Sequence, residues 1–168
     1  MAADNNIILI GMPGAGKSTL GIVLAKRRGM AFCDTDLLLQ EGTGQLLSET
    51  IAERGIDGFK EYENYVLRGL ECAGTVVATG GSAVYGSEAM HHLKRIGRVV
   101  FVDVSFDALE RRLKGDLDGR GVAIGDGMTL RDLYEEREPL YRLWADLTID
   151  TTKMSTREAV EALDEMLG

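Results

Sequence analysis

The sequence contains few cysteines and few prolines, and it has no long hydrophobic run. Its 168 residues include 2 cysteines and 2 prolines. Two cysteines are too few for the disulfide framework of a small secreted protein, and Cys33 and Cys72 lack the spacing of zinc ligands, so we interpret both as packing residues. No apolar stretch approaches the roughly 20 residues that cross a bilayer, and the N-terminal MAADNN lacks the basic and apolar regions of a signal peptide. These absences predict a cytoplasmic protein without a membrane partner.

The sequence also contains fewer basic than acidic residues. The 19 lysines and arginines are outnumbered by 27 acidic residues, which gives a formal net charge of −8. The overall field of such a protein repels nucleic acid, so we expect no nucleic-acid partner, and an anionic ligand would need a local cationic pocket. The length, the hydrophobic content of 45% and the absence of Pro-rich linkers predict a single domain over residues 1–168, and we expect a monomer.

Short β-branched segments alternate with longer segments of helical period. We expect strands at 7–10, 31–34, 75–79, 98–104 and 147–150. This alternation predicts an α/β fold, a three-layer sandwich in which a five-stranded parallel sheet carries helices on both faces.

Two segments interrupt the alternation. Residues at about 37–73 contain no strand signal, whereas Phe59, Tyr62 and Val66 keep helical spacing, so we expect a helical insertion long enough to wall a pocket. The glycine-rich stretch at about 115–127 cannot pack much of a core and is predicted to be a mobile lid.

A phosphate-binding motif, GMPGAGKS at residues 11–18, follows the apolar run IILI and precedes a segment of helical pattern. It fits G-x-x-x-x-G-K-[ST] in the strand–loop–helix context that this pattern requires. Glycines let successive backbone N–H groups face an anion, Lys17 would reach the β- and γ-phosphates, and the Ser18 hydroxyl would hold Mg²⁺. A chance glycine turn is the alternative, but the glycines, the lysine, the hydroxyl and the flanking elements agree on the motif. The predicted ATP-binding residues here are Gly11, Gly14, Ala15, Gly16, Lys17, Ser18 and Thr19.

Two aspartates, Asp34 and Asp36, follow one another where the second strand should end. Ligands of parallel sheets bind outside the carboxyl ends of the strands, so we expect these side chains near the phosphate site. A kinase needs one carboxylate near Mg²⁺ and another near the acceptor hydroxyl. Alternatively, Asp36 could simply cap the helix that begins at LLLQ. The phosphate loop upstream favours the functional interpretation.

Together the phosphate loop, the DTD segment at 34–36, the TGG segment and the late arginines resemble the shikimate kinases over almost the whole chain. These are small P-loop kinases with a fold like that of the nucleoside monophosphate kinases. Their F-R-x-x-E segment is similar to FKEYE at 59–63, their G-G-G segment to GGS within 79–82, and their E-R-x-P-L-Y segment to EREPLY at 136–141.

The resemblance implies roles for individual residues. Asp34 would help to organise Mg²⁺, and Asp36 would bind acceptor hydroxyls and is the candidate to receive the proton. The insertion at 37–73 would hold the acceptor. The other implied residues are Lys60 and Arg137 on the acceptor's carboxylate, Gly80 and Gly81 on its hydroxyls, and Arg120 closing over the phosphates with the lid. Arg112 falls near the arginine that stacks on adenine, although the segment ERRLKG could also be a solvated basic face. Lys17, Asp36 and Arg120 are therefore the expected catalytic residues.

Three positions depart from the family pattern. Lys60 replaces an arginine, which keeps the charge but loses the planar fork that binds a carboxylate at two points. Ser82 replaces the third glycine, and GRGVAIGDG replaces the family's R-P-L-L run, one residue out of register before Arg120. Glu63, three residues after Lys60, could pair with it and hold it toward the pocket, or the pair could be a solvated surface pair.

These observations predict a kinase that transfers the γ-phosphoryl group of MgATP to a hydroxyl of a small polar acid, with shikimate 3-phosphate from shikimate as the leading product. Because two departures fall in the acceptor pocket, a different acceptor stays open: a sugar acid, a related cyclitol or a nucleotide. A nucleotide-binding module without turnover is the alternative outside enzymes. The expected partners are thus ATP and one small molecule, with Mg²⁺ as cofactor.

Overall fold

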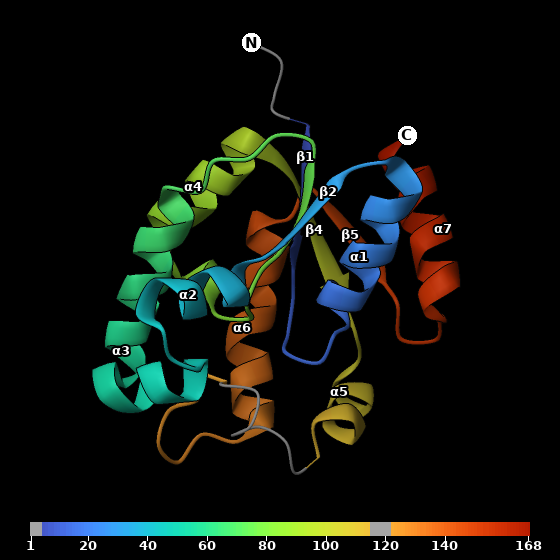
Figure 1. The fold of residues 1–168 in the computed structure, drawn as a ribbon. Coiled ribbons are helices and arrows are strands. Elements are labelled where there is room, and N and C mark those ends of the chain that lie inside the picture. The colour runs from blue at the N-terminus through green and yellow to red at the C-terminus, as the bar shows by residue number, and fades with distance from the viewer. Residues whose placement is uncertain (1–4, 115–121) are drawn as a thin grey trace.

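A five-stranded parallel sheet runs through the middle of the protein (Figure 1). The computed structural model describes residues 5–114 and 122–168. The strand order is β2-β3-β1-β4-β5, and neighbouring strands are parallel throughout. The strands are β1 (Asn6–Ile10), β2 (Ala31–Asp34), β3 (Thr75–Ala78), β4 (Gly97–Asp103) and β5 (Leu147–Asp150). The predicted α/β fold is confirmed, and the strand ends differ from the expected ones by no more than one residue.

Helices cover both faces of the sheet. One face carries α1 (Lys17–Arg28) and α7 (Thr156–Leu167), and the other carries α4 (Ser87–Ile96) and α6 (Leu130–Trp144), as Figure 1 shows. Two further helices, α2 (Thr35–Thr43) and α3 (Leu47–Arg68), form the insertion between β2 and β3, and α3 packs on α4. The short helix α5 (Phe106–Leu113) follows β4, and a 3-10 turn, η1 (Ala83–Tyr85), follows β3.

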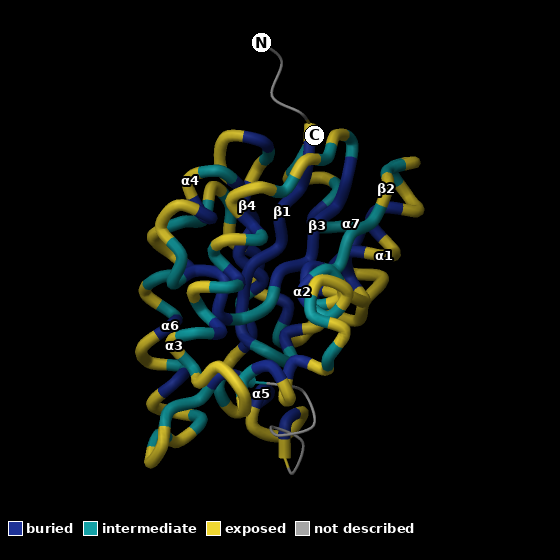
Figure 2. Tube along the Cα trace, turned by 60° about the vertical axis from the view of Figure 1, so that its left-hand side comes forward, coloured by how far each residue is buried: buried dark blue, intermediate teal, exposed yellow. Residues whose placement is uncertain are grey.

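The central strands form the core because they are buried on both faces. All five residues of β1 are buried, and so are all four of β3. Figure 2 shows these strands as a dark blue centre inside half-buried and exposed helices. A parallel sheet covered on both faces selects continuous apolar runs rather than alternation, and IILI and the VVFV at 99–102 are such runs.

The insertion packs around a second, smaller apolar cluster. Leu39 of α2 and Leu47 and Phe59 of α3 are buried together with Ala123, separately from the main core. The Tyr62 hydroxyl also donates a hydrogen bond to the Leu39 carbonyl oxygen at 2.9 Å, which ties α3 to α2. The insertion is thus helical, as predicted, and its helices pack on one another and on Ala123.

The sheet brings three loops together at one edge. In the register of the strands, Ala78 of β3 lies opposite both Leu9 of β1 and Asp34 of β2, so these strands end at nearly the same level. The strand order also reverses beside β1, since β3 lies on one side of it and β4 on the other. Such a reversal opens a crevice at the carboxyl ends of the strands, where ligands bind in open α/β sheets.

Over residues 5–114 and 122–168, no helix is long and apolar enough to span a bilayer. The single domain, the monomeric state and the cytoplasmic location stay predictions.

Candidate active site

The phosphate loop turns sharply between β1 and α1. Gly16, just before α1, has a φ of 86°, in the left-handed region that glycine adopts without strain. The Lys17 side chain folds back over the loop and donates hydrogen bonds to the carbonyl oxygens of Gly11 at 2.7 Å and Met12 at 2.8 Å. Burial lowers the pKa of Lys17 to about 8. The ammonium therefore stays mostly protonated at neutral pH, inside a loop that otherwise offers an anion only backbone dipoles.

Asp34 connects the phosphate loop to the insertion. Ser18 Oγ donates a hydrogen bond to Asp34 Oδ2 at 2.8 Å. The other carboxylate oxygen, Oδ1, accepts a hydrogen bond from the backbone N–H of Asp36 at 2.9 Å, so the N-cap of α2 is Asp34. The alternative that Asp36 caps this helix is therefore wrong. Asp36 lies in the first turn of α2 instead, and it lines a cavity beside the phosphate loop.

A cavity of about 300 Å³ lies between the phosphate loop, the insertion and the turn after β3. Residues from every predicted motif line it, including Gly14, Gly16, Lys17, Ser18, Thr19, Asp36, Gly80, Gly81 and Arg137. Phe59 and Glu63 of α3 and Ser82 of the turn after β3 also line this cavity. Ala123, from the segment before α6, lines it as well. The fold thus brings most of the predicted phosphate residues and most of the predicted acceptor residues to one hollow, whereas Gly11 and Ala15 do not line it. We call it the central cavity.

Two carboxyl groups converge on Gly80. A Cβ atom at this position would lie 2.7 Å from Asp36 Oδ1 and 3.0 Å from Glu63 Oε2, so only a glycine leaves room for both. Burial, and then the charge of Asp34, raises the pKa of Asp36 to about 6. Burial also raises the pKa of Glu63 to about 7. Carboxyl groups that titrate near neutral pH in a cavity are typical of functional sites.

Arg137 of α6 brings a buried positive charge to the same cavity. It is 1% exposed. Its Nε donates a hydrogen bond to the Tyr85 hydroxyl at 3.2 Å, and its Nη2 donates one to the Ala123 carbonyl oxygen at 2.8 Å. A Cβ atom at Gly81 would lie 2.7 Å from Nη1, so the guanidinium packs against the turn after β3. A fixed, dry guanidinium is suited to binding a planar carboxylate.

Lys60 lies apart from the central cavity. Its Nζ sits 3.8 Å from the centre of the Tyr85 ring, a cation–π contact, and Lys60 lines a neighbouring cavity with Tyr85 and Glu136. Lys60 forms no ion pair with Glu63 in either of the two ways considered, since its ammonium lies over Tyr85, and Glu63 Oε1 accepts a hydrogen bond from Ser82 Oγ. The role of Lys60 at the acceptor's carboxylate stays a prediction.

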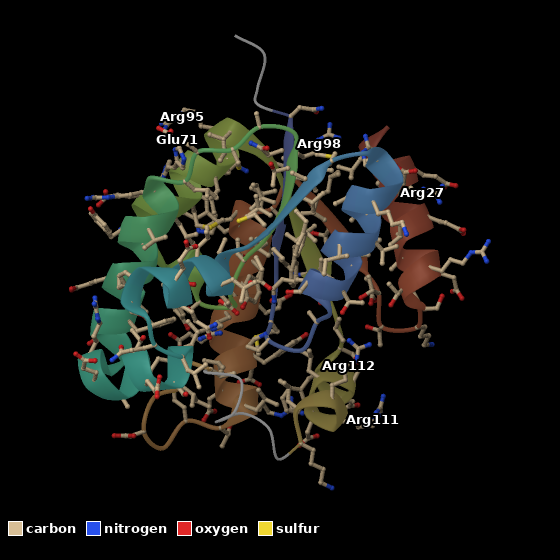
Figure 3. The ribbon with its side chains drawn as sticks, viewed as in Figure 1. Arg27, Glu71, Arg95, Arg98, Arg111 and Arg112 are labelled. Atoms are coloured by element: carbon tan, nitrogen blue, oxygen red, sulfur yellow. The ribbon has the colours of Figure 1, made fainter. Side chains whose placement is uncertain are left out.

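Arg112 lies on the other side of the phosphate loop. Its Nη1 donates a hydrogen bond to the Gly14 carbonyl oxygen at 3.2 Å. Figure 3 shows it on α5 beside the loop that precedes α1, with Arg111 farther from that loop. Arg112 lines a second cavity of about 460 Å³ together with Ala15, Gly16 and Thr19 of the loop region and residues near the start of α7. This is where the resemblance would put the adenine.

Arg120 and most of the expected lid at 115–127 lie outside the described residues. The segment that follows is described from Val122 onward, and both Val122 and Ala123 line the central cavity. The closing of Arg120 over the phosphates stays a prediction.

Comparison with known proteins gives the family. A family model described as shikimate kinase matches residues 13–167. The chain belongs to the shikimate kinase family. A shikimate kinase of Thiobacillus denitrificans is 35% identical over 174 residues, which cover 100% of this chain and 95% of that protein. Another, of Vibrio parahaemolyticus, is 36% identical over 170 residues, which cover 99% and 98%. The structure of the shikimate kinase from Acinetobacter baumannii in complex with shikimate matches with a TM-score of 0.88 at 32% identity, over 97% of this chain and 92% of that one.

Two features of this shikimate kinase family member were not predicted. Ser82 was noted as a departure, but its contact with Glu63 was not predicted, and no role was predicted for Tyr85. The one available signal was Ser82 itself, a side chain with a hydroxyl at a position where the family has glycine. Its partner is on α3, 19 residues earlier, and only the packing of α3 on η1 brings the two together.

Proposed function

We propose that this protein transfers the γ-phosphoryl group of ATP to a hydroxyl of shikimate, giving shikimate 3-phosphate and ADP. The observation that carries the proposal is the central cavity, in which the phosphate-loop lysine, Lys17, shares one hollow with Asp36 and Arg137. Its volume of about 300 Å³ is at the lower end for small-molecule sites, so it fits a single-ring acid better than a nucleotide.

The charges in the cavity match the two ends of such an acceptor. Arg137 would bind the carboxylate, and Asp36 would accept a hydrogen bond from the hydroxyl that reacts. In the step itself, a bond forms between that hydroxyl oxygen and the γ-phosphorus, while the bond from the γ-phosphorus to the β,γ-bridging oxygen breaks. The hydroxyl proton leaves toward Asp36, and the electron pair of the broken bond stays on ADP. Lys17 would stabilise the negative charge on the transferred group and on the leaving oxygen.

The residues present also suit Mg²⁺. This ion prefers oxygen ligands and is usually held by one or two carboxylates together with substrate phosphates. Ser18 Oγ and Asp34 Oδ2 place a hydroxyl and a carboxylate side by side at the phosphate loop. We propose that these two groups hold it. When bound, Mg²⁺ would neutralise charge on the phosphates.

The local charge explains how an acidic protein binds anionic substrates. The net charge is −8, yet Lys17 and Arg137 are 7% and 1% exposed and both line the central cavity. We propose that the protein acts as a monomer.

Release of ADP with a panel of acceptors tests the proposed function. The panel contains shikimate, quinate, gluconate, homoserine and nucleoside monophosphates, each at the same concentration with MgATP. We expect turnover with shikimate well above that with any other acceptor. Turnover with another member of the panel instead would identify that compound as the acceptor. Nucleotide binding without any turnover would indicate a module that is not an enzyme.

A further inference from the structure

The two carboxyl oxygens of Glu63 have different surroundings. Glu63 is 2% exposed and projects from α3 toward the turn after β3. Oε1 accepts a hydrogen bond from Ser82 Oγ, and Ser82 is itself buried at 6% exposure. Oε2 is buried and has no hydrogen-bond partner among the described residues. A buried polar atom without a partner costs about 1–3 kcal/mol, so such an atom on a residue that lines a cavity needs a partner, either a ligand group or a bound water.

The unpartnered oxygen lies next to the predicted reaction position. Oε2 lies 3.0 Å from the point where a Cβ atom at Gly80 would be, and Asp36 Oδ1 lies 2.7 Å from the same point. Glu63 and Asp36 both line the central cavity. Two carboxyl oxygens that lie on either side of one glycine can each form a hydrogen bond with one of two neighbouring hydroxyls of the same ligand.

The cation nearest in sequence does not supply the missing partner. Lys60 precedes Glu63 by three residues on the same helix, but its ammonium lies over the Tyr85 ring and it lines a different cavity. Among the described residues, Ser82 thus holds one oxygen of Glu63 and leaves the other, Oε2, without a partner.

We propose that Ser82 is a positioning residue for acceptor binding: it holds Oε1 of Glu63, so that Oε2 receives the acceptor hydroxyl next to the one that Asp36 takes. This inference rests on the proposed function and adds to it a second hydroxyl subsite. For shikimate the reacting hydroxyl is at position 3, and its one hydroxyl-bearing neighbour is at position 4.

A hydroxyl is the group that this subsite selects. It can donate to an ionised carboxylate or accept from a protonated one, so it pairs with Glu63 in either state. A carboxylate or phosphate in the same place would face Asp36 and Glu63 together and would be repelled by their charge. The acceptor's negative group is therefore directed to Arg137.

Kinetics of Ser82 variants test the proposal. The replacements S82A and S82G both remove the hydroxyl, and S48A, at an exposed serine of the same helix as Glu63, is the matched control. We expect S82A and S82G to raise the KM for shikimate about tenfold, as for a lost hydrogen bond, with the KM for ATP within about twofold of wild type. S48A should keep both values. An unchanged KM for shikimate, or an equal rise for ATP, would overturn the proposal.

The acceptor gives a second test, which needs no variant. With the wild-type protein, 4-deoxyshikimate should have a KM about tenfold above that of shikimate, whereas 5-deoxyshikimate should have a smaller penalty. In S82A the penalty for the missing 4-hydroxyl should shrink, because Oε2 is no longer held toward it. Equal penalties for the two deoxy compounds, or a penalty for 4-deoxyshikimate that is the same in S82A, would contradict the proposal.

Titration of Glu63 without any acceptor separates this inference from the proposed function. NMR of protein labelled with ¹³C at the Glu side-chain carboxyl carbons follows Glu63, with E63Q to assign its signal. Asp36, Lys17, Arg137 and Tyr141 also act on this group, and they are unchanged between wild type and S82A. Because the Ser82 hydroxyl lowers the pKa of Glu63, S82A should raise it. A raised pKa without turnover on shikimate would refute the proposed function alone, and an unchanged pKa would refute the role of Ser82.

Discussion

Ser18 Oγ lies 2.8 Å from Asp34 Oδ2, and this hydrogen bond joins the phosphate loop after β1 to the end of β2. The same aspartate caps α2 through its other oxygen. Asp34 therefore has a structural role and a proposed role at Mg²⁺, and a variant can separate the two.

Replacement of Asp34 by asparagine should affect Mg²⁺ and spare the fold. Asparagine is as good an N-cap as aspartate, so the free energy of unfolding of D34N should stay within about 0.5 kcal/mol of wild type. The lost charge should raise the Mg²⁺ concentration for half-maximal turnover by about tenfold or more. Turnover measured against total Mg²⁺ checks this, with D107N at an exposed position of α5 as control. An unchanged Mg²⁺ dependence in D34N would remove Asp34 from the proposed metal site.

Lys17 should be needed for turnover and not for folding. K17A removes the ammonium that now bonds two loop carbonyls, and we expect turnover to fall by at least about a hundredfold while the circular dichroism spectrum stays the same. K26A, on the exposed side of the same helix, should keep the wild-type rate. A K17A protein with the rate of K26A would contradict the assignment of the phosphate loop.

Glu63 should make stability depend on pH. Burial raises its pKa in the folded protein to about 7 from an ordinary value of 4.5. Between these values the folded protein binds a proton that the unfolded chain has released, so stability falls as the pH rises from 4.5 to about 7 and then levels off.

E63Q lacks this titration and can still accept the hydrogen bond from Ser82. The free energy of unfolding of E63Q minus that of wild type should therefore grow across this window, by up to about 3 kcal/mol. Urea unfolding at several pH values measures the difference, and E61Q, at an exposed position of the same helix, should follow wild type. A difference that is constant with pH would show that Glu63 does not titrate in this range.

An arginine at position 60 tests the contact with the acceptor's carboxylate. If Lys60 leaves the Tyr85 ring to reach that carboxylate, then K60R restores a planar fork and should lower the KM for shikimate by about tenfold, with little change in kcat. K94R, which keeps the surface ion pair to Asp146, is the control. A higher KM in K60R would point to a different acceptor.

The sequence predicted the fold and the phosphate loop well because their signals are local. A β-branched run, a glycine spacing and a following helix all lie within a few residues, and the strand ends came out within one residue. The sequence left Asp36 two roles, a functional carboxylate or the cap of the following helix, and only the hydrogen bond from its own N–H shows that the cap is Asp34.

The acceptor side could not be predicted in the same way. The partners of Glu63 and Lys60 are Ser82 and Tyr85, which lie on the turn after β3 and in η1. Neither pairing follows from helical spacing, which only allowed a contact between Lys60 and Glu63 on one helix face, at the pocket or at the surface. The position of α3 over that turn determines that Glu63 contacts Ser82 and that Lys60 contacts Tyr85.

The transfer itself is tested most directly by ³¹P NMR of the protein with MgATP, with and without shikimate. We expect the γ-phosphate signal of ATP to be replaced by one phosphomonoester signal in a one-to-one ratio with ADP, only when shikimate is present. K17A should leave the ATP signals unchanged. Release of inorganic phosphate at the same rate with and without shikimate would contradict phosphoryl transfer to shikimate.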